Sequence, residues 1–451
     1  MTTRRNFIKK TSLATGALTF GVASGLSAKS YGRVLGANDR VQVGIVGFSN
    51  RCKGSLIPAF LNHNKNLNFE FVGVSDIWNR RREEGAAYLK EKTGDKMKVW
   101  RNNEEMYEDN KIDAVIISTA DFQHALHTVQ AANAKKDAYV EKPFAETMDD
   151  ARVGKKAVEE SGIVFQIGSQ RRSGTNYHAA NQFIKSGKFG DIVMVEMSWN
   201  VNQPGRWRLP QLTKEIRESD TDWKRYLMNR PYEAWDPRKY LEYRLFWPYS
   251  SGIPGQWMSH QIDTVHWFSG YDHPRSVAAN GGIYLWKDGR KNYDTMTSVF
   301  DYGDEAGENG FQVVYSSRFT NSAGGTKEIY YSNGGELNLQ TNKVSANGGL
   351  SAGQANRMGL SENKLDEYNL SDIEVEVVTS ANTGVDNMTS NHMLNWMECV
   401  PSRAKTNGPI EAGYNHSIAN IMTTAALRTG LKATFDKETQ NVLAGGQVFK
   451  Y

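Results

Sequence analysis

The feature that most constrains the fold is an alternation of short apolar runs and helical stretches between Arg40 and Ile163. Four apolar runs have the length of buried strands: Val41–Val46, Phe69–Ser75, Ala114–Ser118 and Ala138–Val140. Helical patterns separate them, as at Arg80–Lys92 and Gln123–Asn133. Such alternation is typical of a parallel sheet, because parallel strands need crossover connections that are usually helices. The sequence therefore predicts a parallel α/β domain over residues 39–162.

The pattern changes after about Ser161, and a chain of 451 residues is too long for one ordinary core. Apolar and polar residues alternate in four later segments: Ile192–Trp199, Ser276–Leu285, Thr297–Phe300 and Gly310–Ser316. This alternation predicts a large, mostly antiparallel sheet with one solvated face in a second α/β domain, residues 163–451. We expect amphipathic helices at Asn391–Val400 and His416–Thr429. Gly and Asn cluster between Thr341 and Arg357, where we expect a long surface loop.

The first predicted strand runs into a glycine turn, Gly47-Phe48-Ser49-Asn50-Arg51-Cys52. In a Rossmann dinucleotide-binding domain this turn holds the pyrophosphate against a helix N-terminus. The G-x-G-x-x-G frame that starts at Gly47 is degraded, because Ser49 and Cys52 occupy the second and third glycine positions. An ordinary strand–turn–helix is the alternative. The dinucleotide reading predicts cofactor contacts from Gly47, Ser49, Asn50 and Arg51.

Asp76 stands at the end of the second predicted strand. A carboxylate at this position accepts hydrogen bonds from the ribose hydroxyls of the adenosine and repels a 2′-phosphate, which favours NAD over NADP. Three arginines follow at residues 80–82, so NADP stays open as the alternative cofactor. The other interpretation of Asp76 is a helix N-cap.

Two polar segments follow later strands of the predicted parallel sheet, Ser118–His124 and Glu141-Lys142-Pro143. Ligands of open parallel sheets bind at the carboxyl ends of the strands. A lysine held there can hydrogen-bond a substrate hydroxyl and stabilise the alkoxide that develops during hydride transfer. In isolation such a lysine is more often a solvated surface charge. The further cofactor contacts that we expect are those of Thr119, Asp121, His124, Glu141 and Lys142.

These motifs together resemble the glucose–fructose oxidoreductase and inositol dehydrogenase family over nearly everything after residue 38. Three later segments add to the resemblance: Gln166–Ser173, Gly252–Gly270 and His392–Gly413. The resemblance implies that Lys142 and His260 are catalytic, and that the second domain's sheet builds a homodimer or homotetramer. It also implies a set of substrate-binding residues: Gln170, Arg171, Arg172, Tyr177, Gln256 and Asp263.

The segment Gln256–Asp263 departs from the family pattern at Gln256, where the family has an acid four residues before the histidine. An acid one helical turn before His260 would raise the pKa of the imidazole and orient its ring. Gln256 can orient the ring by a hydrogen bond but carries no charge, so His260 acts alone or with Asp263. A buried histidine that its neighbours satisfy is the alternative.

Seven aromatic residues surround the expected substrate pocket, and we expect one or two of them to contact ligand while the others are core residues. They are Trp199, Trp207, Trp223, Trp235, Tyr243, Trp247 and Trp257.

Charge and cysteine content exclude several classes of function. The first 36 residues contain six Lys and Arg and no acid, and removing these charges from the net +4 leaves −2. The chain therefore lacks the basic footprint of a nucleic-acid-binding protein. Cys52 and Cys399 are too few for a disulfide framework or a cysteine zinc site, and they can make at most one bridge. His124 and His127 have a permissive metal-ligand spacing without a nearby third ligand, so we predict no metal.

The N-terminus has the pattern of a targeting segment. Thr3–Lys9 contains an arginine pair that resembles the twin-arginine export motif, and the uncharged, mildly apolar stretch Thr11–Ala28 follows. We interpret residues 1–38 as a twin-arginine signal, which predicts the export machinery as a partner and a periplasmic location. A membrane anchor and a short surface helix are the alternatives.

We expect Arg4→Lys combined with Arg5→Lys to trap the protein in the cytoplasm, because the export machinery reads the arginine pair. Fractionation of cells followed by immunoblotting measures the outcome. Unchanged export would mean that the segment is read by another route.

The predicted export places a constraint on how the protein uses its cofactor. A folded protein crosses this pathway with its cofactor loaded, and no pool of free NAD(H) is expected outside the cytoplasm. The sequence therefore predicts an NAD(P)-dependent oxidoreductase with a tightly bound cofactor that acts on a ring hydroxyl of a sugar, glycoside or polyol. One alternative is an NAD-dependent glycosidase that oxidises transiently and eliminates, although such relatives tend to lack the lysine at position 142. The other is a non-catalytic sugar-binding protein.

Overall fold

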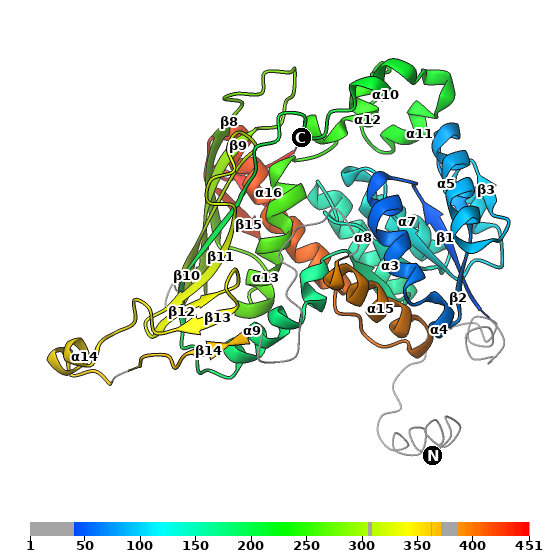
Figure 1. Ribbon diagram of the computed structural model, residues 1–451. Helices are drawn as coiled ribbons and strands as arrows, with labels where there is room; N and C mark the ends of the chain where they lie inside the picture. Colours follow the sequence, from blue (N-terminus) through cyan, green and yellow to red (C-terminus); the bar gives the residue numbers. More distant parts are fainter. Residues whose placement is uncertain (1–39, 305–308, 362, 371–385, 451) are drawn as a thin grey trace, which may run out of the picture. The chain divides into compact units, whose positions relative to one another are not determined.

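The computed structural model describes residues 40–304, 309–361, 363–370 and 386–450, and the chain from Val41 onward forms one compact unit. The unit contains two sheets with helices between and around them (Figure 1). The predicted signal segment, residues 1–38, lies outside the described residues. Within the described ranges no helix is both long enough and apolar enough to cross a membrane.

The first sheet has six strands in the order β3-β2-β1-β4-β5-β6, and every neighbouring pair is parallel. Its strands are β1 (Val41–Val46), β2 (Phe69–Ser75), β3 (Lys98–Trp100), β4 (Ala114–Ile117), β5 (Asp137–Val140) and β6 (Phe165–Ile167). All four residues of β4 and of β5 are buried, as expected for central strands that helices cover on both faces. This strand order is that of the Rossmann fold, so the predicted fold class of the first domain is confirmed.

Helices connect the parallel strands, and the sequence marks their ends. The α8 helix begins after Thr147, whose side chain accepts a hydrogen bond from the amide of Asp150, and it ends at Gly162 in the left-handed conformation (φ 65°). The other helical segments of this domain are a π-helical turn (Cys52–Leu56), α3 (Ile57–Leu61), α4 (Asn64–Leu67), α5 (Asn79–Thr93), α6 (Asn103–Tyr107) and α7 (His124–Asn133).

The second sheet has eleven strands in the order β14-β13-β12-β11-β7-β10-β9-β8-β15-β16-β17. Its pairs are antiparallel except for β7 with β10, which run parallel, so the mostly antiparallel sheet is confirmed. Its strands are β7 (Ile192–Asn200), β8 (Ser276–Gly282), β9 (Thr295–Gly303), β10 (Gly310–Arg318), β11 (Thr326–Ser332), β12 (Gly335–Asn338), β13 (Lys343–Ser345), β14 (Tyr368–Asn369), β15 (Ala433–Asp436), β16 (Asn441–Ala444) and β17 (Gln447–Val448).

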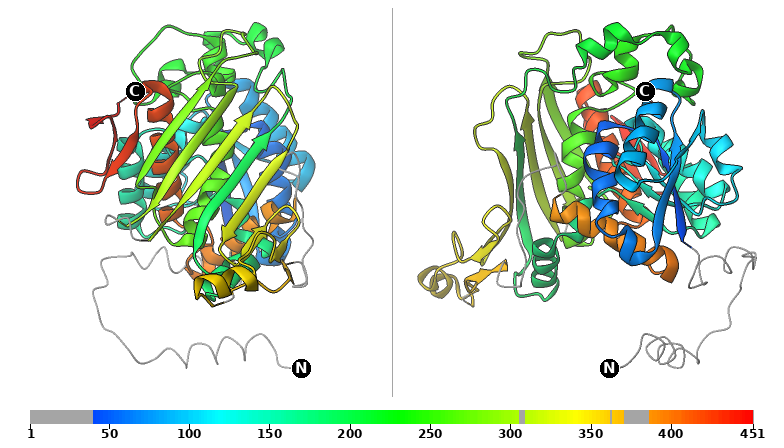
Figure 2. Two further views of the ribbon diagram at one scale, coloured as in Figure 1. Left: turned by 90° about the vertical axis from the view of Figure 1, so that its left-hand side faces the viewer. Right: turned by 45° about the vertical axis from the view of Figure 1, so that its right-hand side comes forward.

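Helices cover one face of this sheet and leave the other face open to view (Figure 2, left). The covering helices are α9 (Thr175–Lys185), α13 (Ser259–Ser269) and α16 (Ile410–Thr429). Along β9 the residues alternate between buried and more exposed positions, which agrees with the predicted single solvated face.

Three expectations are corrected. The strand predicted at Ser276–Leu285 ends at Gly282, because the carboxylate of Asp294 accepts the backbone N–H groups of Tyr284, Leu285 and Trp286 and removes them from the ladder. The loop expected at residues 341–357 contains β13 and most of α14 (Ala352–Met358), which Ser351 caps. The α16 helix is buried nearly all round instead of amphipathic, because it lies between the sheet and neighbouring helices.

A helix from the C-terminal part of the chain completes the core of the Rossmann domain. In α15 (Asn387–Ser402), Met393, Trp396 and Met397 are fully buried in one cluster with residues of β1 and β2. The ring of Trp396 lies 6.4 Å from that of Phe69 and 5.9 Å from that of Tyr139. The first domain is therefore assembled from two distant stretches of sequence.

Candidate active site

A cavity of about 630 Å³ opens at the carboxyl ends of β1, β2 and β4. Six of the predicted cofactor-binding residues line it: Gly47, Ser49, Asn50, Arg51, Asp76 and Thr119. The first four form the turn after β1, Asp76 follows β2, and Thr119 follows β4. The cavity therefore occupies the place where an open parallel sheet binds its ligand.

The turn after β1 explains how a degraded glycine motif keeps its shape. Gly47 has a φ of +83°, and a Cβ there would lie 2.7 Å from the Thr119 side chain and 2.9 Å from the Ser118 carbonyl oxygen. The hydroxyl of Ser49, at the second glycine position, lies 2.6 Å from the hydroxyl of Ser118 and accepts the amide of Cys52 at 3.1 Å. Only the first glycine of the motif is therefore sterically required here.

Asp76 holds the turn and also faces the cavity. Its Oδ2 accepts the amide of Phe48 and its Oδ1 accepts the amide of Trp78, each at 2.9 Å. Burial raises the pKa of the carboxyl, and the two N–H groups oppose that rise. A carboxylate oxygen can accept more than one hydrogen bond, so both oxygens of Asp76 can still accept a hydrogen bond from a ligand.

The three arginines after Asp76 have different roles. Arg81 lines the cavity and donates to Asn50 Oδ1 at 3.0 Å. Arg80 pairs with Glu84 and Glu215 at the surface. Arg82 donates to the backbone oxygen of Asp76 at 2.8 Å. Arg81 is thus the one that lies beside the predicted ribose site.

Residues 206–245, here called the cap, form a wall of the cavity that sequence reasoning missed except for Tyr243. The cap contains α10 (Pro210–Glu215), α11 (Trp223–Leu227) and α12 (Pro237–Leu241). The cavity residues that it supplies are Leu209, Asp222, Lys224, Arg225, Tyr226, Met228, Tyr240, Leu241, Tyr243 and Arg244. No sequence motif predicts that this segment lines the cavity. Its high content of aromatic residues was the one indication in the sequence.

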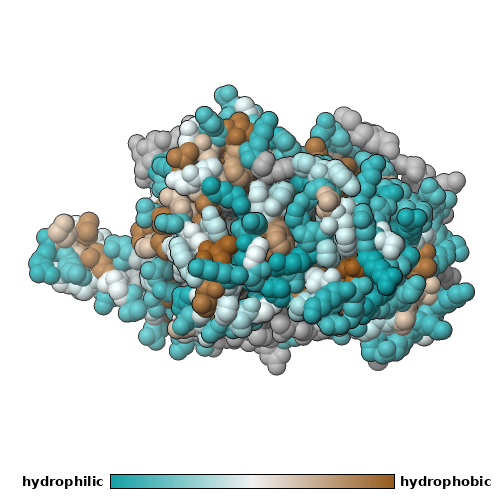
Figure 3. All heavy atoms as spheres, turned by 90° about the horizontal axis from the view of Figure 1, so that it is seen from above, coloured by the Kyte–Doolittle hydropathy of each residue, from teal (hydrophilic) through white to brown (hydrophobic). Residues whose placement is uncertain are grey.

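Contacts with the Rossmann domain hold the cap over the cavity. Arg225 pairs with Glu104 at 2.6 Å, and the surface pair Arg80–Glu215 spans 2.7 Å. The buried amide of Gln123 donates to the backbone oxygen of Tyr226 at 2.7 Å. The face seen from the cap side is mostly hydrophilic, with apolar side chains in small separate groups (Figure 3).

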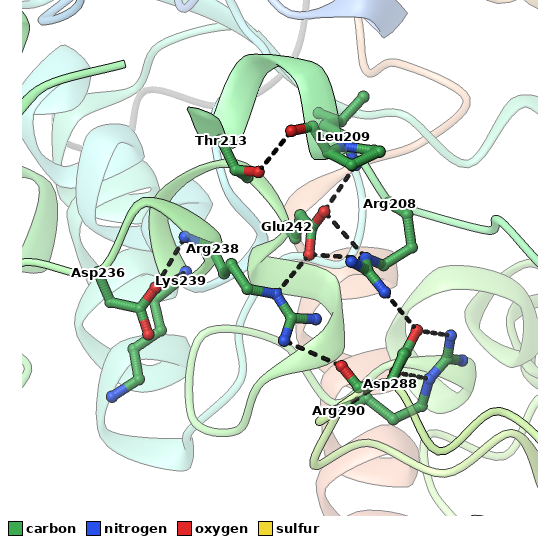
Figure 4. A network of polar contacts seen from close by, with 10 residues as sticks. Arg208, Leu209, Thr213, Asp236, Arg238, Lys239, Glu242, Asp288 and Arg290 are labelled. Atoms are coloured by element: carbon green, nitrogen blue, oxygen red, sulfur yellow. Dashed lines mark hydrogen bonds and ion pairs between the residues drawn. The ribbon is translucent and has the colours of Figure 1, made fainter. Parts of the chain in front are cut away.

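A buried carboxylate organises the cap from inside (Figure 4). Glu242 accepts the amide of Leu209 at 2.7 Å and the guanidinium groups of Arg208 and Arg238 at 3.0 and 2.8 Å. Arg208 also reaches Asp288 at 3.1 Å, which ties the cap to the chain after β8. Because charged hydrogen bonds of this kind are strong and directional, the network fixes the fold of the cap.

The predicted catalytic lysine follows β5 at the same edge of the sheet. Lys142 is half-buried, and its Nζ donates to the backbone oxygen of Gln256 at 2.5 Å. Burial lowers the pKa of Lys142 to about 7, although the nearby carboxylates of Glu141 and Asp121 act in the opposite direction. An amine with such a pKa exchanges protons readily near neutral pH.

Gln256 does not orient His260, contrary to expectation. Its amide donates to Asp121 Oδ2 at 2.6 Å, and its Oε1 accepts from Arg244 Nε at 2.8 Å. The segment Pro254–Met258 is a π-helical turn, so the one-turn spacing assumed for an α-helix does not hold here. Gln256 instead links the cap to the loop after β4.

His260 is buried, and its ring lies 5.9 Å from the ring of Trp199. Burial lowers the pKa of His260 well below its usual value, and the charges of Lys142 and Arg171 lower it further. Asp263 forms a two-pronged pair with Arg172 at 2.7 and 3.0 Å, which favours the alternative in which His260 acts without Asp263. The imidazole is therefore neutral at physiological pH.

The other predicted substrate-binding residues contact buried groups of the protein. Gln170 donates to the Tyr139 hydroxyl at 3.1 Å and to Glu141 at 3.2 Å. Arg171 pairs with the buried Glu328, and its guanidinium stacks 5.3 Å from the ring of Tyr177. None of the predicted substrate-binding residues lines the described cavity. Their contact with substrate stays a prediction.

The aromatic residues divide into two groups and one outlier. Trp199 stacks on Trp257 at 5.7 Å, and Trp207 lies 6.1 Å from Trp257. Trp223 and Trp235 pack with tyrosines inside the cap. Trp247 contacts Phe449 near the C-terminus. The first group is the one next to His260.

Several buried polar atoms at this site have no hydrogen-bond partner among the described residues. They include Arg51 Nη1, Thr119 Oγ1, Asp121 Oδ1, His124 Nε2 and Gln170 Oε1. Nδ1 of His124 lies 2.7 Å from the carbonyl oxygen of Pro143 and must carry its proton there, which leaves Nε2 as an acceptor. Because buried polar groups are almost always paired, these atoms suit a polar ligand such as a dinucleotide and its substrate.

Cys52 and Cys399 are both free and buried. No group of three potential metal ligands occurs within the part of the chain that the structure describes. The Nδ1 atom of His127 contacts Asn103 and Gln130 at 2.8 and 2.9 Å, which accounts for its position.

The chain is similar to known oxidoreductases. Residues 41–169 match the oxidoreductase family with an NAD-binding Rossmann fold. The chain is 31% identical over 162 residues to 1,5-anhydro-D-fructose reductase of Ensifer adhaerens, covering 34% of this chain and 48% of that protein. It is 29% identical over 167 residues to inositol 2-dehydrogenase of Salmonella typhimurium, covering 37% and 48%. The matches thus span about half the length of these curated relatives.

Structural similarity extends over both domains. A levoglucosan dehydrogenase in complex with NADH and levoglucosan superposes with a TM-score of 0.63 at 14% sequence identity, covering 88% of this chain and 99% of that one. At this identity the likeness concerns the fold alone. The family match, the strand order and the cavity at the sheet edge together show that residues 41–169 form a Rossmann domain similar to that of the NAD-binding oxidoreductase family.

Proposed function

We propose that this protein is an NAD-dependent oxidoreductase that acts on a ring hydroxyl of a carbohydrate or polyol. The observation that carries the proposal is Lys142, a half-buried amine with a pKa of about 7 that follows β5, next to β4 in the sheet at whose edge the cavity opens. The similarity to anhydrofructose reductase and inositol 2-dehydrogenase supports this substrate class.

The residues of the first domain would hold the dinucleotide. The turn at Gly47, Ser49 and Asn50 provides the approach for the pyrophosphate, and Asp76 is the acceptor for the ribose hydroxyls. Arg81 beside Asp76 is compatible with a 2′-phosphate, so NADP is the second choice of cofactor. When bound, the nicotinamide supplies the hydride acceptor of the oxidation.

We assign the proton transfer to Lys142. Its neutral amine accepts the proton of the substrate hydroxyl as the C–H bond breaks, and its pKa suits that role near neutral pH. His260, whose pKa is well below its usual value, is a weak base. We therefore assign it a hydrogen bond that positions the substrate oxygen.

The cap supports a cofactor that stays bound. It walls the cavity with aromatic and charged residues and is tied to the Rossmann domain by Arg225–Glu104 and Arg80–Glu215. A retained cofactor fits the proposed twin-arginine export into the periplasm, where none can be replaced. We propose on this basis that each turnover is completed by hydride transfer to a second substrate. A homodimer or homotetramer through the open sheet face remains part of this proposal.

A retained cofactor would also serve a redox-neutral glycosidase. Lys142 is the observation that favours the oxidoreductase between the two. The products distinguish them, because a ketose or ketoglycoside marks the oxidoreductase and a released aglycone marks the glycosidase.

We expect the purified protein to carry NAD(H), because the cap forms one wall of the cavity and is tied to the Rossmann domain. Denaturation followed by chromatography and mass spectrometry of the supernatant identifies the nucleotide. Sugars and polyols are then added to the intact protein while the absorbance of reduced nicotinamide is followed. A protein that carries no nucleotide and binds neither added NAD(H) nor NADP(H) would refute the proposal, and a loaded protein that changes no substrate would indicate a sugar-binding protein.

A further inference from the structure

The arginines around the catalytic end of the cleft are paired with carboxylates, with one exception. Four pairs are present: Arg51–Glu141, Arg171–Glu328, Arg172–Asp263 and Arg244–Asp121. Arg206, on the cap, takes part in none of the ion pairs formed by the residues that the structure describes. An unpaired charge near the interior is costly, so its position requires an explanation.

Arg206 lies beside two aromatic rings. Its guanidinium carbon lies 5.5 Å from the ring centroid of Trp257 and 5.8 Å from that of Trp207. Its Nε is buried and has no hydrogen-bond partner in the described ranges. Burial, and then the charge of Arg244, lower the pKa of Arg206 to about 10. The side chain therefore remains charged but lacks an anion.

Stacking fixes a guanidinium without using its hydrogen bonds. When the face of a guanidinium lies against an aromatic ring, its N–H donors point outward in the plane of the group. A planar carboxylate can accept two of these donors at once, and this pairing is among the strongest hydrogen-bonded arrangements in proteins.

The aromatic rings beside Arg206 belong to a series of ring contacts that includes His260. Trp257 stacks on Trp199 at 5.7 Å with an interplanar angle of 14°, and Trp199 lies 5.9 Å from the ring of His260. The residue before Trp257 is Gln256, which accepts the hydrogen bond of Lys142. Indole faces suit the C–H face of a sugar ring. Two ring contacts thus connect Trp257, which lies against Arg206, with His260.

Of the basic residues in this region, Arg206 and Lys142 belong to none of the ion pairs formed within the described part of the chain. Arg244 lies 4.0 Å from Asp121 and keeps about 30% of its side chain exposed toward the cavity that it lines. His260 is subject to the positive charges of Lys142, Arg171 and Arg51. An anion that enters with the substrate would offset this field, and a neutral sugar would not.

We propose that the substrate is a sugar with one singly charged anionic group, the carboxylate of a uronic acid or a sulfate ester, which binds Arg206 with Arg244 beside it. The inference deepens the proposed function, on which it rests for the location of the sugar. The carboxylate and the sulfate share the chemistry of a monoanion with several hydrogen-bond acceptors.

Matched sugars test the proposal on the nucleotide-loaded protein. The ligands are the methyl glycosides of glucose, galactose and mannose, their uronic acid counterparts and their 6-sulfates. Quenching of tryptophan fluorescence gives Kd. We expect an anionic member to bind about tenfold or more tightly than its neutral counterpart, because hydrogen bonds to charged groups are that strong. The preference should weaken with salt, and the tighter of the two anions identifies the group.

Variants separate recognition of the anion from support of the aromatic rings. Arg206→Gln should reduce the ratio of the neutral to the anionic Kd by about tenfold, and Arg206→Lys should restore part of it. Arg357→Gln, an exposed change on α14, is the control and should leave the ratio unchanged. An unchanged ratio in Arg206→Gln would overturn the proposal, because a merely structural role weakens both ligands equally. Failure of every anionic ligand to bind more tightly than its neutral counterpart would overturn it as well.

The outcome is independent of whether the protein oxidises sugars. A preference for anions without turnover would leave the inference standing and refute the proposed oxidation. Turnover of neutral sugars without a preference for anions would support the proposed oxidation and refute the inference about the anionic group.

Discussion

Lys142→Ala is expected to lower turnover by about 10²-fold or more while the bound nucleotide content stays unchanged, since a positioned acid–base group contributes on that scale. The amine acts in the transition state, so kcat should fall far more than KM rises. Single-turnover measurement of nicotinamide reduction checks this. Near-normal turnover in Lys142→Ala would show that another group accepts the proton.

The pH profile distinguishes a base from a fixed charge. Because the neutral amine is the acceptor, oxidation should become faster as the pH rises through about 7, and the reverse reduction should become slower. In Lys142→Met this titration should disappear. His260→Asn should lower turnover without removing it, because His260 positions the substrate and does not titrate in this range.

The same group makes a prediction for stability. The pKa of Lys142 is about 7 in the folded protein and 10.5 as its ordinary value. Between these pH values the unfolded chain binds more protons, so Lys142 favours folding increasingly as the pH rises from 7 to 10.5. Below pH 7 both states are protonated, and the cost of burying the charge is fully present. Lys142→Met should remove this dependence in denaturant unfolding.

Gly47→Ala is expected to abolish retention of the nucleotide. The positive φ of Gly47 and the 2.7 Å approach of a Cβ to Thr119 force the turn after β1 to move. The strain should also lower the free energy of unfolding by about 1–3 kcal/mol. Nucleotide content and denaturant unfolding measure the two effects.

Gly54→Ala is the matched control for this change. Gly54 lies in the π-helical turn that follows, and a Cβ there meets nothing within 4 Å. Alanine should be neutral or stabilise the helical turn by up to about 1 kcal/mol, with full retention of nucleotide. Retention of nucleotide by Gly47→Ala would show that the dinucleotide does not use this turn.

The sequence predicts much of the fold because hydrophobic periodicity is a local signal. The strands β1, β2, β4 and β5 lie where their apolar runs indicated. The end of β8 could not be predicted in this way, because it depends on the side chain of Asp294, which lies 8 to 10 residues later and accepts the amides of residues 284–286. The burial of α16 likewise depends on which elements pack around it.

The same distinction between local sequence signals and tertiary contacts applies to the site. The residues at the carboxyl ends of the parallel strands could be predicted, since strand ends of one sheet meet at one edge. The partners of Arg171, Arg172 and Gln256 could not, because Glu328, Asp263 and Asp121 become neighbours only through the tertiary fold. The cap lacks a motif altogether, so its contribution to the cavity could be seen only in three dimensions.

The packing of α15 into the Rossmann core has a consequence for synthesis on the ribosome. A nascent chain that ends before residue 387 lacks Met393, Trp396 and Met397, and so exposes the apolar surface of β1 and β2 that they cover. The nucleotide-binding domain starts near residue 40. Its hydrophobic core is nevertheless complete only after more than three quarters of the chain has been synthesised. Premature termination anywhere upstream of α15 should yield an aggregation-prone fragment in place of a smaller, functional dinucleotide-binding protein.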